Sequence, residues 1–165
     1  MEVHKRKLVF ILDCDGTLTD GKMHYTSEGK IMKTFGCDDH SALKAISSKV
    51  EINFITADKR GFDITKKRIE EDMHMKLDLV SDDAISRWEF IRNKYPSKHY
   101  KIIFMGDGIF DHICLKNAEL SFTVKDALKR TLDSATVIIN RRGGDRAVAE
   151  ACLVVDEMCN LKCFE

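Results

Sequence analysis

Short apolar runs alternate along the chain with amphipathic stretches. The apolar runs lie at 8–14, 52–56, 77–80, 101–108, 119–124 and 136–140. A continuous apolar run of this length is typical of a strand that is buried on both faces. The stretches between the runs have apolar residues at helical spacing, which predicts helices over 38–48, 62–73, 83–95, 109–117 and 126–132 and from about residue 145.

This alternation predicts an α/β fold: a Rossmann-like, doubly wound and mostly parallel sheet with helices around it. One segment breaks the pattern. Residues 22–35 contain two strand-like runs around a turn at Gly29, which predicts a β-hairpin insertion over about 21–36. The sequence has a single proline and no Gly/Ser-rich linker, so nothing in it marks a domain boundary. We therefore expect one domain over 1–165. The hairpin is the natural candidate for a cap or an interface.

Composition narrows the classes of function. Lys+Arg and Asp+Glu are both 27, and this balance gives no electrostatic footprint for nucleic acid or an anionic membrane. No stretch approaches the roughly 18 apolar residues that a membrane span needs. The basic and then apolar start of the chain is too short for a signal peptide and runs into acids. With six scattered cysteines and no CxxC pair, we expect a cytoplasmic protein with reduced thiols.

Polar side chains follow three of the predicted strands at the point where each strand ends. In an open parallel sheet, ligands bind beyond the carboxyl ends of the strands, so we expect these side chains to lie together. Several carboxylates at one edge repel one another, and Mg²⁺, completed by water and a phosphate oxygen, relieves that repulsion best. The residues at this edge are Asp13 and Asp15 after the first strand, Thr56 after the second, and Asp107 and Asp111 after the third.

Each of these residues also has an ordinary structural interpretation. A single aspartate at a strand end often caps a helix, Thr56 could cap the helix that follows it, and Gly-Asp-Gly could be a simple turn. Acid, hydroxyl and acid together at three strand ends favour a phosphate site with a bound metal. Such a site also needs a basic group for the phosphate, which Lys59, Arg60 or Arg87 could supply.

These residues carry a family resemblance. The sequence DCDGT at 13–17 resembles the DxDGT signature of haloacid dehalogenase-type phosphohydrolases, Thr56 in FITADKR resembles their second motif, and MGDGIFD at 105–111 their fourth. The hairpin, DGTLTDG, ITADKRG and RRGGDRAVAE resemble the small, minimally capped subgroup of that family, over about residues 7–155. The resemblance implies the family fold, with a hairpin in place of a cap domain.

The resemblance also implies roles for the matching positions. Asp13 would be the nucleophile that forms an aspartyl-phosphate, and Asp15 the general acid and then base. Mg²⁺ would be held by the Asp13 carboxylate, the Asp15 backbone carbonyl and Asp107, with Asp111 as a ligand through water or an orienting group. Thr56 would bind the phosphate, and further donors would be the backbone N–H groups of Cys14, Asp15, Gly16, Thr17 and Ala57.

Two motifs depart from the family pattern. The usual lysine of the third motif is missing from SDDAISRWEF, so we choose Arg87, with Lys76 as runner-up. An arginine there would bind through a planar, bidentate guanidinium, whereas a lysine presents a compact point charge. The second motif reads TADKR where many relatives read TGR, so Lys59 and Arg60 either contact an acidic sugar or are solvated charges. Two further arginines, at 141 and 142 before the glycine pair, are equally open.

The resemblance implies a Mg²⁺-dependent phosphomonoesterase for a small sugar phosphate, with an acidic octulosonate or nonulosonate phosphate as the expected substrate. It also implies a homotetramer in which the hairpins pack together. A phospho-accepting regulatory domain and a catalytically inactive scaffold are the alternatives. The DxDGT sequence on the first strand argues against the former, and intact acids at Asp13, Asp15 and Asp107 argue against the latter.

Overall fold

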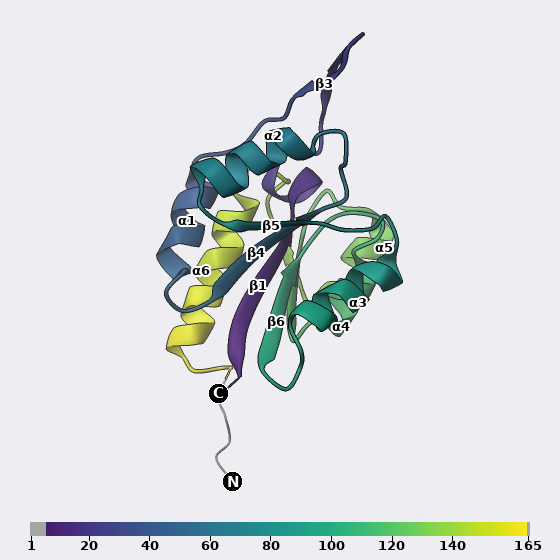
Figure 1. Cartoon of the computed structure of the whole chain (residues 1–165). Coiled ribbons are helices and arrows are strands. Elements are labelled where there is room, and N and C mark those ends of the chain that lie inside the picture. Colours follow the sequence, from purple (N-terminus) through teal and green to yellow (C-terminus); the bar gives the residue numbers. More distant parts are fainter. Residues whose placement is uncertain (1–5, 165) are drawn as a thin grey trace.

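The computed structural model describes residues 6–164, so residues 1–5 and 165 of the predicted domain lie outside the described residues (Figure 1). A six-stranded sheet has the order β5-β4-β1-β6-β7-β8, and every pairing in it is parallel. The predicted parallel α/β fold is confirmed. The strands are β1 (Lys7–Asp13), β4 (Glu51–Thr56), β5 (Lys76–Leu79), β6 (Tyr100–Met105), β7 (Leu120–Val124) and β8 (Val137–Ile139).

Helices cover both faces of this sheet (Figure 1). On one face lie α1 (Asp38–Ile46), α2 (Phe62–Lys66) with its continuation η2 (Lys67–Asp72), and α6 (Ala147–Asn160). On the other face lie α3 (Ala84–Lys94), α4 (His112–Asn117) and α5 (Lys129–Leu132). Among the described residues, no helix combines the length and the apolar character that crossing a membrane requires.

The sheet lies between two apolar cores, which explains the continuous apolar runs of the sequence. Phe10 and Leu12 of β1 pack into the core under α1, η2 and α6, whereas Val9 and Ile11 pack into the core under α3 and α4. Successive strand residues point to opposite faces, so a strand covered on both faces must be apolar at every position. The buried strands then carry their last, polar residues to one edge of the sheet.

Several elements are shorter than the apolar pattern predicts. Strand β1 ends at Asp13 and not at 14, because the chain turns there into η1 (Cys14–Leu18). Strand β6 ends at Met105 and not at 108, and helices α4 and α5 begin at His112 and Lys129 instead of 109 and 126. The loop from 106 to 111 folds around a buried aspartate, which an apolar pattern does not reveal. Outside the hairpin, the other predicted bounds agree to within two residues.

The predicted hairpin is present and projects beyond the carboxyl ends of the sheet strands (Figure 1). Its strands β2 (His24–Thr26) and β3 (Gly29–Met32) pair antiparallel, and Gly29 adopts a positive φ of 123° at the turn. Large apolar side chains on it face outward: Tyr25 is 55% exposed, Ile31 56% and Met32 49%. A two-stranded hairpin is marginally stable by itself, so these side chains need a covering surface.

Candidate active site

A cleft of about 500 Å³ lies at the carboxyl edge of the sheet, below the hairpin. Residues of the β1, β4 and β6 ends meet here, at the point where the chain leaves β4 and β5 on one side of β1 and returns to β6 on the other. Such a switch in strand order is where open α/β sheets bind ligands. Six of the predicted site residues line the cleft: Asp13, Asp15, Ala57, Lys59, Arg60 and Arg87.

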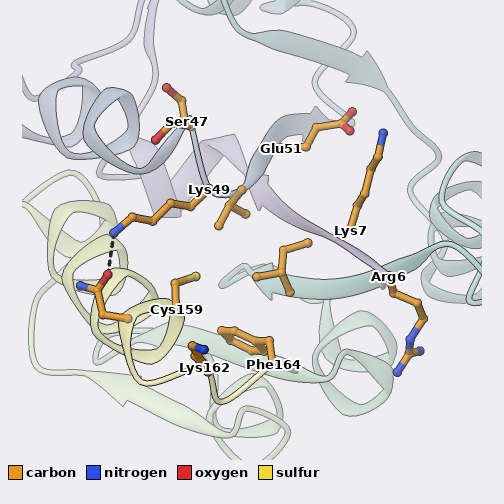
Figure 2. Close-up of a pocket in the computed structure, with 12 residues that line it drawn as sticks. Arg6, Lys7, Ser47, Lys49, Glu51, Cys159, Lys162 and Phe164 are labelled. Carbon is orange, nitrogen blue, oxygen red and sulfur yellow. Dashed lines mark hydrogen bonds between the residues drawn. The ribbon is translucent and has the colours of Figure 1, made fainter. Parts of the chain in front are cut away.

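A larger cavity of about 770 Å³ lies at the opposite end of the sheet, between the starts of β1 and β4 and the end of α6 (Figure 2). Among the described residues that line it, Glu51 is the one carboxylate, and it is bonded to Lys76 and Tyr95. The cavity therefore lacks the convergent acids of the cleft, and we assign the chemistry to the smaller space.

Three aspartates from different elements converge beside the cleft. Asp13 ends β1, Asp107 follows β6 and Asp111 precedes α4, and one oxygen from each lies within 4.8 Å of the others. Gly108 donates its N–H to Asp111 Oδ2 over 2.8 Å, which holds this carboxylate inward. Arg87 of α3 contacts Asp111 and approaches Asp13 Oδ1 to 3.7 Å. The guanidinium thus reaches two of the three carboxylates.

The charges of this cluster are incompletely balanced. Burial, and then the Asp111 carboxylate, raise the pKa of Asp13 well above its ordinary value, although Arg87 opposes the shift. Burial raises the pKa of Asp107 to about 7 against the hydrogen bond from Thr17, and burial also raises the pKa of Asp111. The raised pKa values show that Arg87 alone does not stabilise three ionised carboxylates in this cluster. A further positive charge beside them would stabilise their ionised forms. The donor set therefore fits a hard divalent cation such as Mg²⁺.

The turn η1 approaches this cluster closely, and its glycine permits the approach. Gly16 has a positive φ of 93°, and a Cβ at that position would lie 2.1 Å from Asp107 Oδ2. Thr17 donates its hydroxyl to Asp107 Oδ1 over 2.9 Å. Thr19 Oγ1 accepts the N–H groups of Gly16 and Gly21 over 3.3 and 3.2 Å, which braces the turn.

The glycine pair at 143–144 supports the turn from behind. A Cβ at Gly143 would lie 1.8 Å from the carbonyl oxygen of Gly16, and Gly144 donates its N–H to the carbonyl of Thr17 over 3.1 Å. The neighbouring Arg141 pairs with Glu150 of α6 at 3.3 Å. Among the described residues that line the cleft, neither arginine of the pair at 141–142 is present. In this segment the two glycines support the site.

Asp15 lies in the turn that follows β1 and not on the strand itself. Residue spacing on a strand would point both aspartates the same way, but β1 ends at Asp13 and Asp15 follows it with φ −84° and ψ 113°. Asp15 reaches the cleft with a separate set of partners. Asp15 Oδ2 accepts hydrogen bonds from the Thr56 hydroxyl over 3.4 Å and from the Lys33 ammonium over 3.0 Å.

Lys33 is the site residue that the sequence argument missed. Its side chain is 0% exposed and its Nζ also contacts Asp58 Oδ2 and Thr65 Oγ1, each at 2.8 Å. Burial lowers the pKa of Lys33, but the bonds to Asp15 and Asp58 outweigh burial and raise it above its ordinary value. One feature of the sequence could have indicated that Lys33 points inward. Phe35, two residues later, packs on the core, and side chains two residues apart on a strand point to the same face.

The remaining candidates divide between the cleft and other places. Arg87 lies at the acidic cluster, whereas Lys76 pairs with Glu51 near the start of β4. Lys59 and Arg60 are exposed at the cleft. The Cys14 side chain is buried in the core, which leaves its backbone for a ligand. Thr56 is buried, and its hydroxyl accepts the N–H of Asp58 over 3.1 Å.

Comparisons with solved structures show that the fold is that of haloacid dehalogenase (HAD) hydrolases. A HAD superfamily (subfamily III A) hydrolase from Legionella pneumophila superposes with a TM-score of 0.80 at 23% identity, covering 96% of this chain and 86% of its own. The 3-deoxy-D-manno-octulosonate (KDO) 8-phosphate phosphatase from Moraxella catarrhalis, in complex with magnesium, phosphate and KDO, gives 0.78 at 24%, covering 98% and 92%.

The sequence resembles one kind of phosphatase. The KDO 8-phosphate phosphatase KdsC of Salmonella typhi is 25% identical over 150 residues, which are 87% of this chain and 76% of that protein. The enzyme of the same name from Escherichia coli K12 has the same identity and coverage. No family model matches the chain. The resemblance to HAD phosphatases that the motifs predicted is therefore confirmed.

Proposed function

We propose that this protein is a Mg²⁺-dependent phosphomonoesterase that hydrolyses a small sugar phosphate through an aspartyl-phosphate. The observation that carries the proposal is the cluster of Asp13, Asp107 and Asp111 beside the cleft, with Arg87 close to Asp13 and in contact with Asp111. A buried carboxylate beside a cation is suited to attack phosphorus, and surplus negative charge around it is suited to hold a metal.

In this proposal each aspartate has its own task. A carboxylate oxygen of Asp13 attacks the phosphorus, and the bond from phosphorus to the ester oxygen breaks. Protonated Asp15 gives its proton to that oxygen, so an alcohol leaves; Asp15 then takes a proton from the water that hydrolyses the aspartyl-phosphate. Asp13, Asp107, Asp111 and the Asp15 backbone carbonyl would hold Mg²⁺, which supplies positive charge to the phosphoryl group.

Neutral donors at the ends of β1 and β4 complete phosphate binding in this proposal. Thr56 and the backbone N–H groups of 14–17 and 57 lie at the ends of β1 and β4, where they can donate to phosphate oxygens. Arg87 serves as the basic residue of the third motif. Lys59 and Arg60 are exposed at the same cleft and offer positive charge to an anionic part of a substrate.

The substrate we propose is KDO 8-phosphate or a related acidic (nonulosonate) sugar phosphate. Support comes from the KDO 8-phosphate phosphatases that the chain resembles and from the exposed Lys59 and Arg60 at the cleft. We expect kcat/KM for acidic octulosonate or nonulosonate phosphates to exceed that for heptose phosphates by roughly tenfold or more, since a paired charge is worth several-fold in binding. Phosphate release across this panel is the measurement. A preference for the uncharged sugars would contradict the substrate assignment.

We further propose a homotetramer whose hairpins pack together, in the cytoplasm, with residues 1–165 as a single domain. The exposed Tyr25, Ile31 and Met32 support the assembly, because a neighbouring subunit would cover them. Light scattering is expected to give about four times the chain mass of 18.9 kDa. A monomer at micromolar concentration would overturn the proposed assembly.

A further inference from the structure

Two lysines of the hairpin segment reach into the cleft region and share one carboxylate. Lys30 of β3 and Lys33, just after β3, both contact Asp58 Oδ2, and their side chains are 2% and 0% exposed. Burial raises the pKa of Asp58, but hydrogen bonds from Lys30 and Lys33 outweigh it and lower that pKa to about 2. The two lysines differ in their other contacts: among the described residues, Lys33 also binds Asp15 and Thr65, whereas Lys30 lines the cleft.

The space for this cluster is created by a glycine. A Cβ at Gly61 would lie 2.2 Å from Asp58 Oδ2, 2.8 Å from Lys30 Cδ and 2.9 Å from Lys33 Cε. Gly61 also donates its N–H to Asp58 Oδ1 over 3.1 Å. Any larger residue would displace the lysines from Asp58, so the cluster is a defined packing arrangement and not a chance surface ion pair.

The Lys33 ammonium has no hydrogen left for a substrate. An ammonium group has three N–H donors. Those of Lys33 point to Asp15, Asp58 and Thr65, at distances of 2.8 to 3.0 Å. Lys33 is also absent from the described residues that line the cleft. Its contacts thus point to an action through Asp15 and not on the phosphate.

We propose that Lys33 is a positioning residue that fixes the Asp15 carboxylate for proton transfer, so that the hairpin forms part of the catalytic apparatus. Asp15 lies in a turn and needs such a fixed contact, since the strand ends at Asp13. Thr56, the other side-chain partner of Asp15, is farther away at 3.4 Å. The inference rests on the proposed function, in which Asp15 transfers the proton.

Formation and hydrolysis of the aspartyl-phosphate depend differently on a correctly placed Asp15 carboxylate. With an alkyl phosphate, the first step needs a proton from Asp15 for the departing oxygen. With p-nitrophenyl phosphate, nitrophenolate departs without that proton, and the Asp13 carboxylate still displaces it. Hydrolysis of the aspartyl-phosphate requires Asp15 as base for either ester. A misplaced Asp15 therefore allows the first step with the aryl ester and slows the second.

The test is rapid-mixing kinetics of Lys33→Met on p-nitrophenyl phosphate with Mg²⁺. We expect a burst of nitrophenolate approaching one equivalent per site, followed by a steady-state rate that is lower by about 10²-fold, the usual size of a general-base contribution. An alkyl phosphate is expected to give no burst. Lys30→Met is the matched control, because it removes a lysine from Asp58 but not from Asp15. It is expected to lose less activity and to show no burst.

Two milder variants distinguish a loss of positioning from a loss of folding, because each keeps the positive charge at position 33. Lys33→Arg keeps the charge and is expected to restore part of the steady-state rate, while Thr65→Val keeps both ion pairs and is expected to give the same burst pattern in milder form. The role of Lys33 would be overturned if Lys33→Met and Lys30→Met lost equal steady-state activity and neither gave a burst. It would also be overturned if neither Lys33→Met nor Thr65→Val gave a burst. An inactive wild type would instead overturn the proposed function, so the two failures are distinguishable.

Discussion

Replacing Asp13 with asparagine is expected to lower the turnover of p-nitrophenyl phosphate by roughly 10⁴-fold or more, as loss of a nucleophile does in enzymes with a covalent intermediate. The amide has nearly the same shape as the carboxylate, but it is a very weak nucleophile. Arg87 keeps its ion pair with Asp111 in this variant, so the local structure is retained. Release of inorganic phosphate with Mg²⁺ present measures the effect.

The fold of Asp13→Asn should remain intact. Removing one of several buried, mutually repelling carboxylates is not expected to lower the Tm, since burial and Asp111 both raise the pKa of Asp13. Asp20→Asn is the matched control, because Asp20 is an exposed aspartate of the same segment that bonds the N–H of Lys22. Its turnover is expected within about twofold of wild type, as for most surface changes. Wild-type turnover by Asp13→Asn would remove Asp13 from the mechanism.

Removing Mg²⁺ is expected to abolish turnover and to make the stability of the protein depend on pH. In the metal-free protein, burial raises the pKa of Asp107 to about 7, whereas its ordinary value is 3.8. Between these two values the folded state binds more protons than the unfolded state, so the free energy of unfolding falls as pH rises from about 4 to about 7. Mg²⁺ favours the ionised carboxylates and opposes this loss.

Thermal unfolding in EDTA and in Mg²⁺ at two pH values measures the effect. A chain of this size gains roughly 2–4 °C in Tm per kcal/mol, so we expect Mg²⁺ to raise the Tm by about 5 °C or more at pH 8 and by less than about half as much at pH 5.5. Asp107→Asn removes the titrating carboxylate and is expected to flatten the pH dependence in EDTA. An equal Mg²⁺ effect at both pH values would contradict the assignment of the acidic cluster to the metal.

The sequence was sufficient where a residue's place follows from the local pattern. An apolar run predicts a buried strand, and the residue after it must lie at the sheet edge, so Asp13, Thr56 and Asp107 could be placed together. The parallel sheet and the hairpin followed from the same alternation of apolar runs and turns. These features depend on short-range periodicity, which one sequence contains.

Other parts of the site depend on segments that are far apart in the chain. Lys33 reaches Asp15 and Asp58 because the chain returns from the hairpin to the edge of the sheet at this residue, and Gly143 packs on Gly16 from a segment far along the chain. Apolar spacing carries no information on such contacts. The apolar run continues to Cys14, so periodicity also does not reveal that the strand ends at Asp13.

The most direct test of the account is to locate the phosphoryl group during turnover. Wild-type protein is mixed with p-nitrophenyl phosphate, with Mg²⁺ or with EDTA, and quenched in acid. Peptide mass spectrometry is then combined with measurement of the phosphate released. We predict a phosphoryl group on Asp13 and continued phosphate release, both dependent on Mg²⁺. A stable phosphoryl group without turnover would indicate a regulatory domain. No Mg²⁺-dependent release, or a phosphoryl group on another residue, would contradict the account.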